Sequence, residues 1–391
     1  MKFFIIIFFT LFAYLNYSIG NFYFRALNIS GSSLKISWLL YILATVTIIA
    51  APIVYRKYPQ KYPGFFYNSL QWVGYIFFGI YSVLAFFMLI DQVGFFFYHH
   101  LGHPDKEKQS LVLVVLANIS FIVTIVVSWA GYFSATKNPE LKRISIPIEN
   151  LPDDFHGITI LQMSDVHVGQ TIKSRFVNSL VKMSNELSPD IVVLTGDLTD
   201  GAHSELAHEL IDFKKINAPL GKFMIPGNHE YYWGFDKWIT HWEELGFVPL
   251  LNEHKIIQKN DSQVIMAGVH DYSAHRIKKT YLSSPSMAIN NAPENLVKIL
   301  LAHQPRSVYE AARVGYDLQL SGHTHSGQYF PFNILIYLFQ PYVKGLSRHK
   351  KTWIYVNQGT GYWGPPNRFG APPEVTLIEL IKADVVLKEK A

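Results

Sequence analysis

The chain has 391 residues, of which 49% are apolar, 15% are aromatic and only 16% are charged. This composition excludes a wholly cytosolic globule, because soluble chains carry about 25% charged residues, and the abundant aromatic residues exclude a disordered chain. The absence of cysteine excludes disulfide frameworks, thiol nucleophiles, Cys-ligated zinc and iron–sulfur clusters, so His, Asp, Glu and Asn remain for any metal chemistry.

The positive charge is concentrated at one end of the chain. Residues 1–143 carry 11 Lys and Arg against 4 Asp and Glu, whereas residues 144–391 carry 23 against 25. Basic loops beside membrane spans explain this distribution better than a nucleic-acid partner. We therefore expect the lipid bilayer, and no nucleic acid, among the partners of the N-terminal third.

Four apolar stretches lie in the first 135 residues, and each supplies most of the ~20 residues that a helix needs to cross the hydrocarbon core. They predict transmembrane helices near residues 3–19, 36–55, 70–97 and 111–135. The first stretch also fits a signal peptide. An uncleaved span is the favoured interpretation, because the sequence Tyr-Ser-Ile-Gly at 17–20 is a poor cleavage site.

The basic residues between these stretches predict the orientation. Positive residues accumulate in cytoplasmic loops, and the side with more of them is expected to face the cytoplasm. An integral membrane protein with both termini and the C-terminal domain in the cytoplasm follows. One side carries Lys2, Arg56, Lys57, Lys61, Lys137, Lys142 and Arg143, and the other carries Arg25, Lys35, Lys106 and Lys108.

From residue 144 to residue 391, short β-rich runs alternate with helical patterns, which is typical of a layered α/β domain. This pattern predicts a membrane region over 1–143 and one further domain over 144–391. The predicted strands are 157–163, 190–194, 222–225, 264–269, 297–301, 318–320, 353–357 and 375–380, and the predicted helices are 173–187, 204–215, 235–245 and 305–313.

Oxygen and imidazole donors directly follow five of these strands. Side chains from such strand ends converge on one rim of a sheet. Mixed Asp, His and Asn ligation suits divalent ions such as Mn, Fe or Zn, and seven donors serve two ions only if one carboxylate bridges them. An isolated Asp-x-His is a weak signal, but five such groups in order are hard to explain as surface polar clusters. The donors are Asp165 and His167, then Asp197, then Asn228, then His303, then His323 and His325.

Five motifs, in this order, resemble the calcineurin-like metallophosphoesterase family. The tail from residue 355 to 375 and the four apolar stretches are similar to its membrane-associated bacterial branch with N-terminal transmembrane helices. Ser326 departs from that branch, which usually has glycine there. The motifs are Asp165-x-His167, Gly196-Asp197, Gly227-Asn228-His229-Glu230, His303 and Gly322-His323-x-His325.

The resemblance implies a two-layer β-sandwich flanked by helices, with a site for two divalent metal ions at one edge. His229 would protonate the leaving oxygen. Glu230 would either orient a ligand histidine or act as a helix-start carboxylate, and Arg368 and Asn357 are candidates for substrate binding. The implied ligands are Asp165, His167 and His325 for the first ion, Asn228, His303 and His323 for the second, and Asp197 as the bridge.

These observations predict a membrane-anchored phosphoesterase that hydrolyses a phosphodiester or pyrophosphate bond by direct attack of a metal-bound hydroxide. The alternative is a membrane sensor or scaffold that binds a phosphorylated ligand without turnover. Residues 329–342 form an apolar insert followed by Lys344, Arg348, Lys350 and Lys351. The insert either packs onto the sandwich as a helix or enters the membrane interface, and the second interpretation predicts an amphiphilic, lipid-linked substrate.

Overall fold

The computed structural model describes residues 2–57, 64–102 and 104–383, with the backbone alone for residues 2–9, 56 and 57. The chain forms two units. The helical unit comprises Met1–Phe133 and Gly364–Phe369, and the sandwich unit comprises Ser134–Trp363 and Gly370–Ala391.

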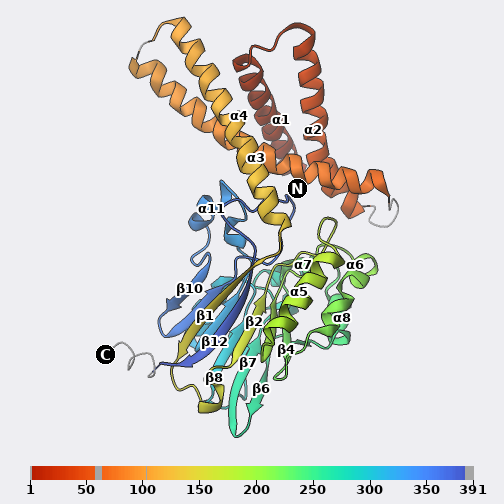
Figure 1. The fold of residues 1–391 in the computed structure, drawn as a ribbon, viewed down its shortest axis with the longest axis vertical. Coiled ribbons are helices and arrows are strands. Elements are labelled where there is room, and N and C mark those ends of the chain that lie inside the picture. The colour runs from red at the N-terminus through yellow and green to blue at the C-terminus, as the bar shows by residue number, and fades with distance from the viewer. Residues whose placement is uncertain (1, 58–63, 103, 384–391) are drawn as a thin grey trace. The chain divides into compact units, whose positions relative to one another are not determined.

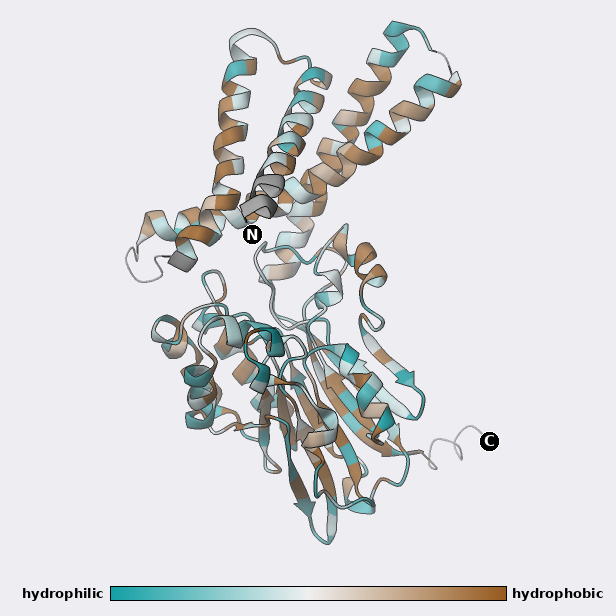
Figure 2. Cartoon of the chain, turned by 180° about the vertical axis from the view of Figure 1, so that it is seen from behind, coloured by the Kyte–Doolittle hydropathy of each residue, from teal (hydrophilic) through white to brown (hydrophobic). Residues whose placement is uncertain are grey.

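Four long helices account for the N-terminal third (Figure 1): α1 (Lys2–Ala26), α2 (Gly31–Lys57), α3 (Phe65–Gly102) and α4 (Lys106–Thr136). Three segments, Gly31–Tyr55, Phe65–Gly102 and Lys106–Thr136, are long and apolar enough to cross a membrane. In Figure 2 the ribbons of these helices carry long stretches coloured as hydrophobic residues.

The predicted set of long N-terminal helices is therefore confirmed, and within the described residues three of the four meet the requirements for a span. Side chains such as Leu40 and Ile122 are more than half exposed, which suits contact with lipid better than contact with water. Two parts of the sequence prediction lie outside the residues described with side chains. They are the start of the predicted span at 3–19, and Lys61, one of the basic residues used to predict the orientation.

The sandwich unit contains two six-stranded mixed sheets. In spatial order, the first sheet consists of β1 (Glu140–Ile148), β12 (Glu374–Lys382), β2 (Thr159–Met163), β3 (Ile191–Thr195), β4 (Lys222–Ile225) and β5 (Val248–Pro249). The second consists of β10 (Gly345–His349), β11 (Thr352–Val356), β9 (Leu318–Ser321), β8 (Val297–Leu301), β7 (Ser262–Gly268) and β6 (Glu253–Lys259).

Helices flank both sheets. The α-helices are α5 (Ser174–Leu187), α6 (His203–Leu210), α7 (Asn228–Tyr232), α8 (Phe235–Glu244), α9 (Pro285–Ala288), α10 (Val308–Arg313) and α11 (Phe332–Leu335). The 3-10 helices are η1 (Asp153–Phe155), η2 (Ile211–Lys215), η3 (Ala274–Arg276), η4 (Lys279–Tyr281), η5 (Pro305–Ser307), η6 (His325–Gly327) and η7 (Ile336–Leu338).

The alternation of side chains along the central strands builds the layers. On β2, Ile160 belongs to the core between the two sheets, and the next residue, Leu161, belongs to the core beneath α5, α6 and α8. A third core joins the outer face of the second sheet to α9 and α10. Both faces of the central strands are thus buried, which explains their almost continuous apolar sequence, and the predicted two-layer sandwich flanked by helices is confirmed.

All eight predicted strands are present, with boundaries shifted by a few residues. The four strands that the pattern missed, β1, β5, β6 and β10, are the four edge strands of the two sheets. Strands β1, β6 and β10 carry charged side chains, which hide the period-two signal, and β5 is only two residues long. Strand β1 begins at Glu140 and pairs in parallel with β12 over Glu374–Lys382.

Candidate metal centre

The backbone is strained at five of the predicted ligands. Asp165, His167, Asp197, His323 and His325 all adopt left-handed conformations, with φ between 49° and 70°. A non-glycine residue in this region costs ~1–3 kcal/mol, and such strain clusters where side chains must converge at a functional site. Within the same loop, Ser326 has φ 52°, the conformation that glycine favours at the position where the resemblance expects it.

Two motif glycines permit the loops to approach one another. A Cβ atom on Gly227 would overlap the carboxylate of Asp197, and a Cβ atom on Gly322 would overlap Ser164 and the carboxylate of Asp165. Any side chain at either position would therefore displace a predicted ligand.

Asp165, His167 and His325 form the first donor cluster, from the loops after β2 and β9. The Nε2 atoms of His167 and His325 lie 3.0 Å apart, and Asp165 Oδ1 lies 3.2 Å from His325 Nε2. The backbone N–H of His323 and the hydroxyl of Ser164 donate to the Asp165 carboxylate, at 3.0 Å and 2.5 Å to Oδ2. These bonds hold the carboxylate against the two rings.

Asp197, His303 and His323 form the second cluster. The Nδ1–H of His303 donates to the carbonyl of Thr195 at 2.8 Å, which leaves Nε2 with a lone pair. That buried Nε2 lies 3.2 Å from Asp197 Oδ2 yet makes no hydrogen bond. A proton or a metal cation between the two atoms relieves their repulsion, so this arrangement fits a metal site.

Asp197 links the two clusters. Its Oδ2 lies 3.2 Å from His303 Nε2 and 4.0 Å from His167 Nε2, while its Oδ1 accepts the backbone N–H of His229 at 2.8 Å. Asn228 Oδ1 is also buried without a hydrogen bond. The structure thus brings together His and Asp donors from the ends of β2, β3, β8 and β9 in an arrangement that is consistent with a binuclear metal site.

The electrostatics of this centre favour positive charge. Burial alone would raise the pKa of Asp197, but His303 and His229 hold it well below its usual range. Burial alone would also raise the pKa of Asp165, but the neighbouring His325 lowers it below its usual value. Conversely, Asp197 raises the pKa of His303 well above its usual range against the opposing effect of burial. Bound cations would satisfy the same preference.

Asp200 is the site residue that sequence reasoning missed. Its Oδ1 lies 2.5 Å from His229 Nδ1, and its Oδ2 lies 3.4 Å from His167 Nδ1. Although burial opposes the charged ring, Asp200 and Asp197 raise the pKa of His229 to about 10. These two carboxylates therefore favour the protonated form of the His229 ring. The available signal was a second carboxylate three residues after Asp197 on the same strand exit.

Glu230 is fully buried and supports the Asp197 loop. Its carboxylate accepts the backbone N–H groups of Asp197, Leu198 and Thr199 at 2.7–3.1 Å, and that of Gly227 at 2.7 Å. The bond from Gly227 closes the first turn of α7, as predicted for a helix-start carboxylate. The three other bonds give this residue a second role, which is to fix the backbone that carries the bridging candidate.

The two candidate substrate residues occupy different surroundings. Asn357 is buried and engaged at both ends, since its Nδ2 donates to Thr376 and its Oδ1 accepts the N–H of Gly359. These bonds indicate a role in shaping the turn after β11. Arg368 belongs to the helical unit, where it is fully buried and its backbone N–H donates to Gly131. It is thus not a solvated loop arginine, and phosphate binding by either residue stays a prediction.

Comparison with known proteins identifies relatives of this arrangement. A model of the calcineurin-like phosphoesterase family matches residues 158–327. A "transmembrane protein with metallophosphoesterase domain" from Danio rerio is 32% identical over 319 residues, which cover 78% of this chain and 72% of the relative. An "uncharacterized metallophosphoesterase" from Helicobacter pylori is 35% identical over 257 residues, with 65% of this chain and 67% of the relative covered.

Among solved structures, the phosphopantetheinyl hydrolase PptH from Mycobacterium tuberculosis aligns with 53% of this chain and 91% of its own, at 13% identity and a TM-score of 0.33. This likeness is too distant to support an argument about activity. The sequence relatives, in contrast, include both an animal protein and bacterial ones.

Proposed function

The chain belongs to the calcineurin-like phosphoesterase family, and from this premise we propose that it is a membrane-anchored enzyme that hydrolyses a phosphodiester or pyrophosphate bond of a lipid-linked substrate. Metal-dependent phosphoester hydrolysis follows from the family and from the His and Asp clusters. The proposal also covers the substrate and the roles of the site residues. It further includes a domain boundary between residues 143 and 144 and a cytoplasmic position of the sandwich unit.

In this proposal, Asp165, His167 and His325 hold one ion, Asn228, His303 and His323 hold the other, and Asp197 bridges them. The buried Nε2 of His303 and Oδ1 of Asn228, which make no hydrogen bonds, support these assignments. When bound, Mn, Fe, Zn or similar ions supply the positive charge that polarises a phosphoryl group and activates water.

The residues around the ions position and protonate the leaving group. Asp200 favours the protonated form of the His229 ring, which can then donate a proton to the departing oxygen. Asp200 accepts a hydrogen bond from Nδ1 of the same ring, which orients Nε2 away from Asp200 and stabilises the charged form. Glu230 keeps the Asp197 loop in place through four backbone hydrogen bonds.

An exposed apolar segment, residues 332–339, carries the proposal of a lipid-linked substrate. Its side chains are not packed onto the sandwich, since Ile334 is 60% exposed, Leu338 76% and Phe339 66%. In Figure 2 the ribbon of this short helical segment is coloured mostly as hydrophobic residues. Adjacent exposed side chains of this size mark a binding surface, and for a chain anchored by membrane helices the bilayer is an apolar phase that such a surface can enter.

Hydrogen bonds tie this segment to the metal-binding loops at its C-terminal side. Arg306, three residues after His303, donates to the carbonyl of Phe339 at 2.8 Å. Thr324, between His323 and His325, donates to the carbonyl of Val343 at 2.6 Å. A membrane-bound segment would therefore be mechanically connected to the loops that carry the proposed ligands.

The charges that follow the segment suit an anionic membrane surface. Lys344, Lys350 and Lys351 are exposed, whereas Arg348 is engaged with Glu149 at 2.8 Å and with the ring of Trp353. Free lysines beside an inserted apolar segment would contact lipid phosphates. The excess of basic residues in the loops on the same side of the predicted spans supports a cytoplasmic surface.

The test compares a diacylglycerol 4-nitrophenyl phosphate in mixed micelles with water-soluble bis(4-nitrophenyl) phosphate, both with added Mn. Changing Ile334, Leu338 and Phe339 to Ser should lower kcat/KM for the lipid diester by about tenfold or more, as lost apolar contacts do, and leave the soluble diester unaffected. The matched control changes Ile211, Ile277 and Leu282, which are similarly exposed elsewhere on the sandwich unit, to Ser.

Equal loss on both diesters would contradict the lipid-linked substrate. Hydrolysis of phosphomonoesters alone would contradict the proposed bond class. Binding of both diesters by metal-loaded protein without any turnover would favour the alternative of a membrane sensor or scaffold.

A further inference from the structure

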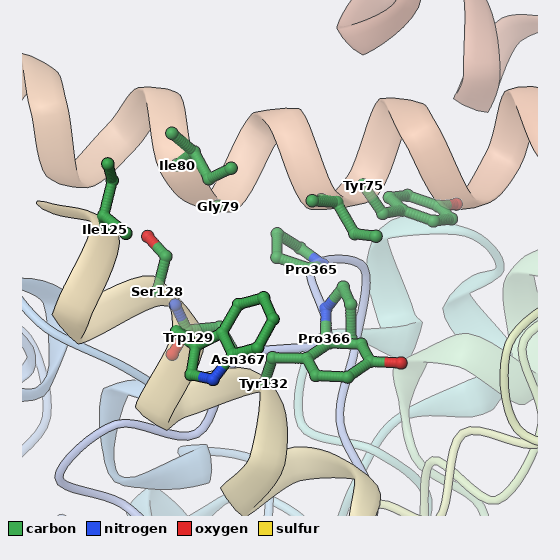
Figure 3. A pocket seen from close by; sticks show the side chains of 11 residues that line it. Tyr75, Gly79, Ile80, Ile125, Ser128, Trp129, Tyr132, Pro365, Pro366 and Asn367 are labelled. Atoms are coloured by element: carbon green, nitrogen blue, oxygen red, sulfur yellow. The ribbon is translucent and has the colours of Figure 1, made fainter.

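The helical unit contains a cavity of about 240 Å³, formed entirely by its own residues. Its walls come from α3, from the last turns of α4 and from the segment Gly364–Phe369, as Figure 3 shows. Gly79 contributes no side chain, and Ile80, Ile125 and Trp129 contribute apolar surface. The lining is therefore suited to a hydrocarbon ligand.

We propose that this pocket binds one hydrocarbon chain of the lipid-linked substrate, an inference that rests on the proposed function. The volume equals that of roughly eight water molecules at ~30 Å³ each, which is room for part of one chain but not for a whole lipid. A pocket with an apolar lining, within helices apolar enough to span a bilayer, has lipid chains as its most concentrated apolar ligand.

One polar atom in the lining adds specificity. The Oγ of Ser128 is buried and makes no hydrogen bond within the described part of the chain. A buried hydroxyl without a partner is unfavourable, so a ligand that supplies an acceptor or a donor recovers the lost free energy. An ester carbonyl or hydroxyl near the start of a lipid chain has this chemistry.

The aromatic lining indicates the depth of the pocket. Tyr75, Trp129 and Tyr132 contribute rings, and such residues concentrate where the hydrocarbon core meets the headgroups. Helix α4 ends at Thr136, and β1 of the sandwich unit begins at Glu140. The pocket thus lies in the final turns of the membrane helix, where an ester group of a lipid would be found.

The segment that closes the pocket also continues to the metal centre along the chain. The backbone N–H of Arg368 donates to the carbonyl of Gly131 at 2.9 Å, and a Cβ atom on Gly131 would overlap Asn367. This contact anchors the segment on α4. Trp363, two residues before Pro365, has its ring 5.9 Å from that of His229. The covalent chain therefore joins the pocket lining to a residue that contacts the proposed proton donor.

The experiment uses the full chain in nanodiscs that contain a phosphatidylglycerol with a photoactivatable diazirine on one acyl chain. After irradiation, labelled peptides are mapped by mass spectrometry, a readout that needs no turnover. We expect label on peptides that contain Trp129 and Tyr132. Gly79→Leu, which fills the pocket, should reduce this label about tenfold. Gly94→Leu, at a position on the same helix with open space around it, should not.

A second variant distinguishes a filled pocket from a misfolded protein. Ser128→Leu fills the pocket from α4, and it should reduce both the label and kcat/KM for the lipid diester without changing the turnover of the soluble diester. No label on the pocket peptides, or equal label in Gly79→Leu and Gly94→Leu, would overturn the pocket assignment while leaving the proposed function intact. Label that depends on Gly79, in a protein with no preference for the lipid diester, would support the pocket and contradict the proposed substrate.

Discussion

His229 Nδ1 and Asp200 Oδ1 lie 2.5 Å apart, so the imidazole proposed as the proton donor is held by a carboxylate. Asp200 follows Asp197 on the exit of β3, whereas His229 is the second residue of α7. One loop therefore supplies both the proposed bridging carboxylate and the group that positions the acid. This pairing makes Asp200 a positioning residue of the centre.

Asp200→Asn should reduce turnover about 10- to 100-fold on substrates with poor leaving groups, because the neutral amide no longer stabilises the charged His229 ring. Substrates that release 4-nitrophenolate should be affected much less. The measurement is kcat for a 4-nitrophenyl and an alkyl diester at saturating Mn. Asp236→Asn, at an exposed position on α8, is the control and should behave as the native protein. An equal deficit on both diesters would assign Asp200 to metal binding through its contact with His167.

His229→Ala should retain both metal ions and lose ~10²–10⁴-fold in kcat on alkyl leaving groups, the usual contribution of a general acid. The deficit should shrink for 4-nitrophenolate, which departs without a proton. Metal content by elemental analysis and a series of leaving groups of increasing pKa test this assignment. A deficit independent of leaving-group pKa would mean that another residue donates the proton.

Asp197→Asn should abolish activity and weaken both metal positions, because its Oδ2 faces His303 of one cluster and His167 of the other. Titration with Mn followed by elemental analysis should show less than two ions bound. His325→Ala is the comparison, since it removes a donor from the first cluster alone and should spare the second ion. Two tightly bound ions in Asp197→Asn would exclude the bridging role.

Gly322→Ala should lower the free energy of unfolding by ~1–3 kcal/mol, since the new methyl group would overlap Ser164 and Asp165. It should also weaken the first metal position by displacing the Asp165 carboxylate. Gly315→Ala is the control, because its φ of +83° strains alanine but the space around it is open. Denaturant unfolding should show a loss of stability for both variants, with metal loss confined to Gly322→Ala.

Much of this architecture is readable from local sequence. The central strands are buried on both faces, so the first four residues of β3, 191–194, form an uninterrupted apolar run that a search for hydrophobic patterns detects. The edge strand β1 alternates exposed and partly buried residues and includes Lys142 and Arg143, and its pairing with β12 joins segments more than 200 residues apart. That long-range pairing has no local signal.

Residue type and short spacing were enough to predict the apolar helices, the order of the strand-end motifs and the identity of the candidate ligands. Three contacts became visible only in the folded chain: Asp200 reaches the ring of His229, Glu230 holds the Asp197 loop, and Arg368 is buried in the helical unit. The tertiary structure also decided that residues 332–339 leave their apolar side chains exposed. The physical reason is that contacts between residues far apart in the chain depend on how the loops close, and residue type alone does not specify that closure.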